Sequence, residues 1–290
     1  MKKLLTILFA VSLLSFLPVH SESQTQPPRP PSGMAQSFAG SAMDIMDKEL
    51  NGYTLEDEYY IGRAVAANIL NVYKPYTRNE ELTQYLNLIC LVLVINSSNP
   101  VNYNGYHVIV LDSPDFNAFA SPGGHIFITR GLVEAAASED MLAALVAHEL
   151  AHIMLKHGIR LIEDMSIFNN ASMAAMQGQA MSGNAAANRL MSYRSSVADL
   201  SDTMIKNGYS QTYEFEADRE ALKLLAASGY DPAGLLDILR VLQSVQSSQR
   251  GGFNTTHPAP AARISNVEGV LRNFTVQDTK SSRSGRFKNK

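Results

Sequence analysis

Several residue types that would identify a class of protein are scarce in this chain of 290 residues. It has one cysteine, Cys90, so an intramolecular disulfide framework is excluded. Lys and Arg number 24 against 27 Asp and Glu, which leaves no global basic signal for nucleic acid. The chain also lacks the run of about 18 consecutive apolar residues that predicts a membrane-spanning helix. Because 46% of its residues are apolar, we expect a sizeable core in one or two domains.

The N-terminus has the pattern of an export signal. A short basic segment precedes an apolar stretch over residues 4–17, and Val19 and Ser21 are small residues in the positions of a cleavage site. The stretch is shorter than the roughly 20 residues of a spanning helix, which favours cleavage over anchoring. We therefore expect a signal peptide over residues 1–21 and a bacterial periplasmic protein with no transmembrane segment after cleavage.

The rest of the chain divides into three parts by composition. Residues 22–43 are rich in Ser, Gln, Pro and Gly, which predicts a flexible linker. Residues 44–275 carry the periodic apolar segments of a folded domain. Residues 276–290 are basic and polar and predict a disordered tail. Too little chain follows residue 275 for a helical-repeat domain, so none is expected.

Within this domain, helices and short strands are predicted in an order that favours an α+β fold. Runs of β-branched residues predict strands at 106–111 and 125–129. Apolar residues at helical spacing predict helices at 55–73, from Ser138 to about Leu161, at 212–228 and at 232–246. If the strand at 125–129 lies at an edge of the sheet, an extended peptide can pair with it.

The sequence His148-Glu149-Leu-Ala-His152, within the helix that begins at Ser138, has the pattern H-E-x-x-H. Residues four apart share one face of a helix, so the two imidazoles can bind one cation. With seven histidines in the chain, the pattern is expected by chance only about 0.008 times. Two histidines and a carboxylate on an apolar helix are also costly to bury without a partner. The motif therefore predicts a metal site.

A catalytic zinc ion normally has three protein ligands and one open position, so a third ligand is expected elsewhere. Glu214 and Asp218 are four residues apart and share a helical face. We expect Glu214 to reach the metal and Asp218 to accept the outer N–H of a ligating histidine. Glu216 points away from Glu214 and is expected to be solvated. Taken alone, this pair would more often be two acidic residues on the surface. It is interpreted as part of a metal site because it follows the histidine motif in the sequence.

Together these motifs resemble metallopeptidase family forty-eight. The likeness covers roughly residues 50–275 and includes the segment 117–132, Thr256-His257-Pro258 and Arg263-Ile264. The chain is most similar to the exported, BepA-like branch, since membrane helices of the HtpX type are missing. The resemblance implies a gluzincin fold that is mostly helical, with a small β-sheet beside the histidine helix. It also implies a zinc-dependent endopeptidase with one zinc ion per chain.

The resemblance further implies roles for single residues. Glu149 would be the general base that activates water for attack on the peptide bond. His257 would lie near the zinc ion, where it either donates to the oxyanion or fills the open position as a self-inhibiting plug. Arg263 would lie near the cleft. His157, five residues past His152, is expected to be structural.

Unfolded or misfolded polypeptides, including outer-membrane proteins, are the expected substrates, and no nucleic-acid partner is expected. Residues 164–207 hold six of the 12 methionines and are interpreted as a lid over the cleft or as a packed helical hairpin. A function of another class stays open: a latent chaperone-like binding module whose metal site is structural or self-inhibited.

Overall fold

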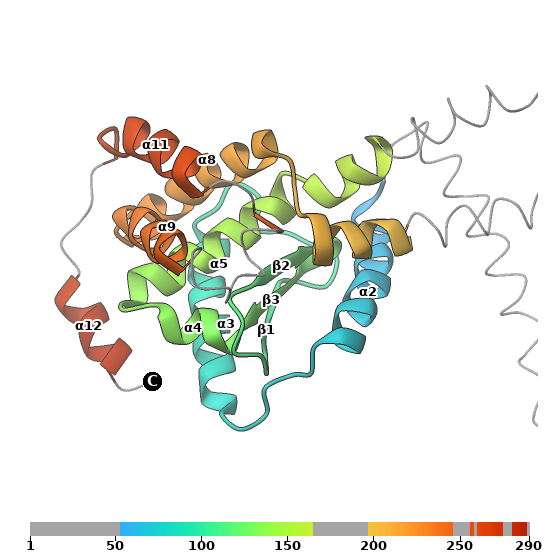
Figure 1. Cartoon of the computed structure of the whole chain (residues 1–290), viewed down its shortest axis with the longest axis horizontal. Helices are drawn as coiled ribbons and strands as arrows, with labels where there is room; N and C mark the ends of the chain where they lie inside the picture. The colour runs from blue at the N-terminus through green and yellow to red at the C-terminus, as the bar shows by residue number, and fades with distance from the viewer. Residues whose placement is uncertain (1–52, 165–196, 246–255, 258–259, 275–279, 289–290) are drawn as a thin grey trace, which may run out of the picture. The chain divides into compact units, whose positions relative to one another are not determined.

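The computed structural model describes residues 53–164, 197–245, 256–257, 260–274 and 280–288 (Figure 1). All of them belong to one compact unit, Ala39–Lys290. The expected signal peptide at 1–21 and linker at 22–43 lie outside the described residues, and so does most of the segment 164–207. Among the helices that are described, none combines the length and the apolar composition that a membrane span requires.

The sheet has three strands in the order β1-β3-β2. Strand β1 (His107–Leu111) pairs in parallel with β3 (His125–Thr129), and β2 (Ala118–Ser121) pairs with β3 in the antiparallel sense. Strand β3 is therefore central, so the condition for peptide pairing at 125–129, a position at an edge of the sheet, is not met. The short turn η1 (Pro122–Gly124), in which Gly123 adopts φ 73°, returns the chain so that β3 pairs with β2. The other edge of β3 pairs with β1.

The two faces of the sheet pack against different helices. Along β3, Phe127 points into a cluster with residues of α2 (Leu55–Val72), whereas Ile126 and Ile128 point into the main core. Helix α2 begins at Thr54, whose hydroxyl accepts the N–H of Asp57 in a capping box. Helix α5 (Glu139–Met154) lies on the opposite face from α2 (Figure 1).

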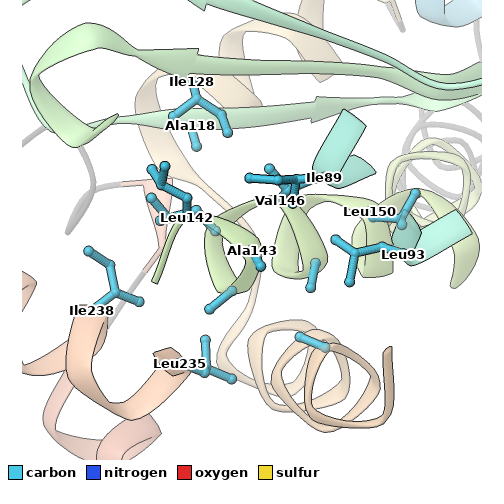
Figure 2. Packing of buried hydrophobic residues seen from close by; sticks show 14 of the residues in the cluster. Ile89, Leu93, Ala118, Ile128, Leu142, Ala143, Val146, Leu150, Leu235 and Ile238 are labelled. Carbon is cyan, nitrogen blue, oxygen red and sulfur yellow. The ribbon is translucent and has the colours of Figure 1, made fainter. Parts of the chain in front are cut away.

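Helix α5 is the centre of the main core, and its residues from Glu139 to Ile153 are all buried. It begins as predicted at Ser138, whose Oγ accepts the N–H of Met141. Besides the sheet, it contacts α3 (Glu80–Ile95), α8 (Gln211–Ala227) and α9 (Ala233–Val245). Figure 2 shows the labelled apolar residues of α5 between those of the strands, α3 and α9. The histidine motif is thus fixed on a helix that is enclosed on all sides.

Helix α5 ends at Met154, before the predicted end at about Leu161. Lys156 adopts φ 56°, and a separate helix covers residues 157–164. The Nζ atom of Lys156 lies 2.5 Å from Oε1 of the buried Glu58 on α2, which fixes the left-handed turn. Because the chain changes direction here, the helix at 157–164 does not continue the axis of α5.

The helices after α5 agree with the prediction except at the C-terminus. Helices α8 and α9 match the predicted segments closely, and α11 (Pro260–Leu271) packs against both. The tail at 276–290 was predicted to be disordered, whereas residues Lys280–Lys288 form helix α12. Ion pairs hold α12 to the N-terminal turn of α5: Arg283 lies 2.8 Å from Asp140, and Arg286 lies 2.5 Å from Glu139. The predicted α+β class, mostly helical with a small sheet, is confirmed.

Candidate metal centre

The two histidines of the motif converge on one point. His148 and His152 lie one turn apart on α5, and their Nε2 atoms are 3.1 Å apart. Their exposed fractions are 2% and 1%. Two ring nitrogens at this distance in a buried site are positioned to share one cation.

Glu214 completes the predicted ligand set from the first turn of α8. That turn is capped by Ser210, whose side chain accepts the N–H of Tyr213. Oε1 of Glu214 lies 3.3 Å from Nε2 of His152, and Oε2 lies 3.4 Å from Nε2 of His148. The packing of α8 along α5 therefore brings together all three side chains that the sequence proposes as ligands.

A fourth donor, His257, comes from the segment that precedes α11. Its Nδ1 lies 3.1 Å from Oε1 of Glu214 and 3.4 Å from Nε2 of His148. The ligand atoms of His148, His152, Glu214 and His257 all lie within 4.8 Å of one another. Three imidazole nitrogens and one carboxylate oxygen form a donor set that suits tetrahedral zinc.

The outer nitrogen of His148 is held by a carboxylate that is itself paired with arginine. Nδ1 of His148 lies 3.1 Å from Oδ1 of Asp218, so Nδ1 donates and Nε2 offers its lone pair to the cluster. Arg263 donates to both oxygens of Asp218, at 2.6 and 2.8 Å. Its NH1 lies 2.9 Å from Oε2 of Glu214. With an exposed fraction of 1%, Arg263 lies behind the cluster and does not line an open cleft.

The outer nitrogen of His152 meets a second histidine. Nδ1 of His157 lies 2.8 Å from Nδ1 of His152, and Nε2 of His157 lies 3.2 Å from Oε2 of Glu216. The same oxygen of Glu216 accepts from Arg160 at 2.6 Å. Glu216, which was expected to be solvated, is therefore held by two partners, and its side chain is 27% exposed.

Sequence reasoning missed the contact between His157 and His152. On one continuous helix, residues five apart differ by about 140° around the axis, so the predicted extension of α5 would have separated these rings. The left-handed turn at Lys156 brings them together instead. Such a turn at a lysine has no reliable sequence signal, because non-glycine residues rarely adopt this conformation.

Strand β2 runs beside the cluster and directs toward it the edge that pairs with no further strand in the described part of the chain. The carbonyl oxygen of Ala118 lies 3.3 Å from Nε2 of His257, and that of Ala120 accepts from the Tyr209 hydroxyl at 3.3 Å. The N–H of Tyr209 in turn donates to the carbonyl of Thr256. Two carbonyls that would otherwise face outward from the sheet are therefore occupied by side chains next to the metal centre.

A comparison with known protein families matches residues 80–271 to Peptidase family M48. The chain belongs to this family. Membership confirms two predictions made from the sequence: the family itself and a zincin-like α+β fold.

Three curated proteins are similar to this M48 chain. The beta-barrel assembly-enhancing protease of Yersinia pestis is 27% identical over 286 residues, which cover 95% of this chain and 55% of that protein. Metalloprotease LoiP of Escherichia coli K12 is 27% identical over 190 residues, 65% of this chain and 70% of LoiP. The mitochondrial metalloendopeptidase OMA1 of Arabidopsis thaliana is 28% identical over 162 residues, 54% of this chain and 30% of OMA1. The chain spans about half the length of the assembly-enhancing proteases that it matches.

Glu149, the glutamate of the M48 motif, is buried next to the four donors with an exposed fraction of 1%. Neither of its carboxylate oxygens has a hydrogen-bond partner in the part of the chain that is described. Its Oε1 lies 3.7 Å from Nε2 of His257, and burial raises the pKa of its carboxyl group. A buried carboxylate without a partner needs an explanation, and a metal ion with its water beside it supplies one. The residues present therefore fit a zinc ion.

The charges around the centre favour a cation. Burial opposes ionisation of Glu214, but the adjacent His257 and the positive charge of Arg263 hold the pKa of Glu214 well below its usual range. Arg263 likewise outweighs the effect of burial on Asp218 and keeps the pKa of Asp218 below its ordinary value. Burial and Arg263 lower the pKa of His148, but its hydrogen bonds to the two carboxylates outweigh both and raise the pKa to about 9. Two ionised carboxylates thus remain in the buried site.

Proposed function

We propose that this M48 chain is a zinc-dependent endopeptidase in which His148, His152 and Glu214 bind one zinc ion and Glu149 is the general base. The proposal is supported by the convergence of these ligand atoms, and by the carboxylate of Glu149 directly beside them, which has no hydrogen-bond partner among the described residues. A zinc ion bound there would polarise the scissile carbonyl and lower the pKa of a water molecule toward about 7.

The side chains around the site supply the remaining steps of peptide hydrolysis. Glu149 accepts the proton of the attacking water at its carboxylate and passes it to the nitrogen of the leaving amine. Asp218 orients His148 through its Nδ1, and Arg263 holds both Asp218 and Glu214 in place. Because Arg263 contacts these carboxylates and is buried, its proposed role is to position the ligands.

His257 is proposed to fill the open coordination position in this state of the molecule. Its Nε2 faces the carbonyl of Ala118, so Nε2 donates and the lone pair of Nδ1 faces the other ligand atoms. This orientation supports the plug over the oxyanion donor, since a donor to the substrate would need an N–H directed into the site. The ring must then move before substrate binds.

The proposed substrates are unfolded or misfolded polypeptides of the bacterial cell envelope, which an exported, periplasmic protein would meet. One support is the similarity to a beta-barrel assembly-enhancing protease, that of Yersinia pestis. A second is the signal-peptide pattern at residues 1–21. A third is the outer edge of β2 beside the metal centre, since a strand edge that pairs with no other strand can bind extended backbone and tolerates many side chains.

The variant Glu149→Gln tests the peptidase. It keeps the shape of the side chain but removes the proton acceptor, so cleavage of casein is expected to fall by about 100-fold or more. Zinc content per chain, measured by mass spectrometry, should not change. Glu134→Gln, at an exposed glutamate of α4 (Arg130–Ala135), is the matched control and should leave both quantities unchanged. Wild-type cleavage by zinc-loaded Glu149→Gln would refute the assigned base.

A latent chaperone-like binding module is the second candidate function. It is favoured by the enclosure of the centre, because no ligand residue is more than 2% exposed. This candidate predicts that Glu149→Gln still complements a deletion strain at wild-type protein levels. Loss of complementation at those levels would support the peptidase.

A further inference from the structure

The two metal-binding histidines have different outer partners. Nδ1 of His148 contacts the carboxylate of Asp218 directly. Nδ1 of His152 instead contacts another imidazole, that of His157, at 2.8 Å. His157 is buried completely, with an exposed fraction of 0%. A histidine at this position is not explained by metal binding, since its ring lies on the far side of His152 from Glu214 and His148.

The carboxylate behind His157 determines which nitrogen of each ring carries hydrogen. Oε2 of Glu216 accepts a hydrogen bond from the guanidinium of Arg160 at 2.6 Å, and this ion pair keeps Glu216 a carboxylate. An ionised carboxylate only accepts, so Nε2 of His157, 3.2 Å away, is the donor.

It follows that Nδ1 of a neutral His157 has a lone pair and accepts the N–H on Nδ1 of His152. Nε2 of His152 then has no hydrogen, and its lone pair faces Oε1 of Glu214 at 3.3 Å. The opposite tautomer of His152 would place two lone pairs against each other on one side and an N–H toward the metal position on the other.

Aromatic stacking fixes the planes of both rings. The Tyr213 ring lies 4.6 Å from that of His157 with an interplanar angle of 4°, and the Tyr209 ring lies 4.3 Å from that of His152 at 16°. The guanidinium of Arg160 lies 4.3 Å from the centre of the Tyr213 ring. Rotation of either imidazole would disturb these stacks, so the hydrogen bond between the two histidines is held in one geometry.

We infer that His157 and Glu216 are positioning residues for the metal centre, which set the tautomer and the orientation of His152 through the hydrogen bond between the two rings. This inference rests on the proposed binding of zinc by His152. Outer-shell partners of this kind typically contribute about 10–100-fold to metal affinity. Both histidines of the motif are thus connected to a carboxylate that pairs with an arginine. His148 contacts Asp218 directly. His152 is connected to Glu216 through the ring of His157.

Two variants of the full chain test the inference. His157→Phe keeps a ring against Tyr213 but removes both nitrogens, and zinc affinity, measured by competition with a chelator, should fall about 10–100-fold. Glu216→Ala removes a partly exposed carboxylate and leaves His157 in place. This variant should also lower the zinc affinity, by several-fold. His107→Phe, at an exposed histidine on β1, is the matched control and should bind zinc as the wild type does.

A second measurement does not need the metal or any activity. In the metal-free wild-type chain, ¹⁵N chemical shifts of labelled histidines should show His152 protonated at Nδ1 and His157 at Nε2, and Glu216→Ala should mix the tautomers of His152. The inference is overturned if both folded variants bind zinc within about twofold of the wild type, or if His152 of the wild type carries its hydrogen on Nε2. Failure of the proposed function has a different signature, since the wild-type chain would then bind no zinc at all.

Discussion

At the scale of single residues, the metal centre depends on buried charges that compensate one another. Arg263 is the only fully buried arginine among the largest enclosed side chains of the described residues, and it serves two carboxylates at once. Removing one partner of such a group leaves the others buried without compensation. The ligand geometry is therefore expected to depend on a residue that does not itself contact the metal position.

Arg263→Met is expected to lower the free energy of unfolding of the metal-free chain by about 3–5 kcal/mol, because Asp218 and Glu214 lose their shared cation inside the core. Urea denaturation measures the change. Arg240→Met is the matched control, since Arg240 pairs with Glu268 at 2.9 Å but the two side chains are 54% and 48% exposed. That variant should cost less than about 1 kcal/mol. Equal costs for the two variants would contradict the role given to Arg263.

At the scale of helices and strands, the sequence predicts best where one physical signal acts locally. Ser138 starts α5 as the predicted N-cap, and i, i+4 spacing places His148 with His152, and Glu214 with Asp218, on one helical face. Helical periodicity could not show where α5 ends, since the apolar pattern continues past Met154 while the backbone turns at Lys156. The central position of β3 also had no local signal, because strand order follows from tertiary pairing.

The candidate site was predictable to a similar extent. His148, His152 and Glu214 follow from spacing and from the number of ligands that zinc requires, and the structure brings them together. Glu149 lies beside them, 3.7 Å from Nε2 of His257. The ring of His157 and the ion pair of Glu216 depend on a turn and on a neighbouring helix. Contacts of this kind arise from the packing of distant segments, which a pattern along one segment does not encode.

Helix α12 shows how far packing can override composition. Its residues are polar and basic, yet Arg283 is buried, pairs with Asp140 and donates to the carbonyl of Gly229 at 2.7 Å. The N-terminal turn of α5 carries the acidic residues Glu139 and Asp140. These carboxylates can pair with the arginines of α12 only because the fold brings the C-terminal segment next to them. The C-terminal segment is therefore part of the support of the motif helix.

Arg283→Ala is expected to lower the free energy of unfolding by about 3 kcal/mol, because the buried Asp140 loses its positively charged partner. Chemical denaturation measures the loss, and proteolysis near residue 280 should become faster as α12 detaches. Arg219→Ala, at an exposed position of α8, serves as the control and should change stability by less than about 0.5 kcal/mol. An unchanged unfolding midpoint for Arg283→Ala would show that α12 contributes nothing to the fold.

At the scale of the whole molecule, the metal centre joins segments that are distant in sequence. His148 and His152 come from α5, Glu214 from α8, and His257 from the segment before α11. A ligand that binds only the folded chain stabilises all of these contacts together. Loss of the metal should therefore affect the cooperative unfolding of the described core and not one loop alone.

Removal of zinc with a chelator is expected to lower the melting temperature, with a stabilisation of about 4 kcal/mol when free zinc exceeds its dissociation constant 1,000-fold. The effect should grow from about pH 6 to pH 8. The sign follows from His148, whose pKa is about 9 without metal. Below that value a proton competes with zinc for Nε2, and the competition weakens as pH rises. Thermal melts with and without chelator at both pH values measure this stabilisation by zinc. A melting-temperature difference that shrinks from pH 6 to pH 8 would contradict His148 as a zinc ligand.

The occupied edge of β2 has a consequence for selectivity under the proposed function. A polypeptide that pairs with this strand must displace the Tyr209 hydroxyl and the His257 ring from Ala120 and Ala118. Only a chain with free backbone amides can compete for those carbonyls, and a natively folded domain has already used its own. Under the proposed function, damaged and intact proteins would then be distinguished at the active site itself, because only a chain whose backbone amides are not used in intramolecular hydrogen bonds can bind there.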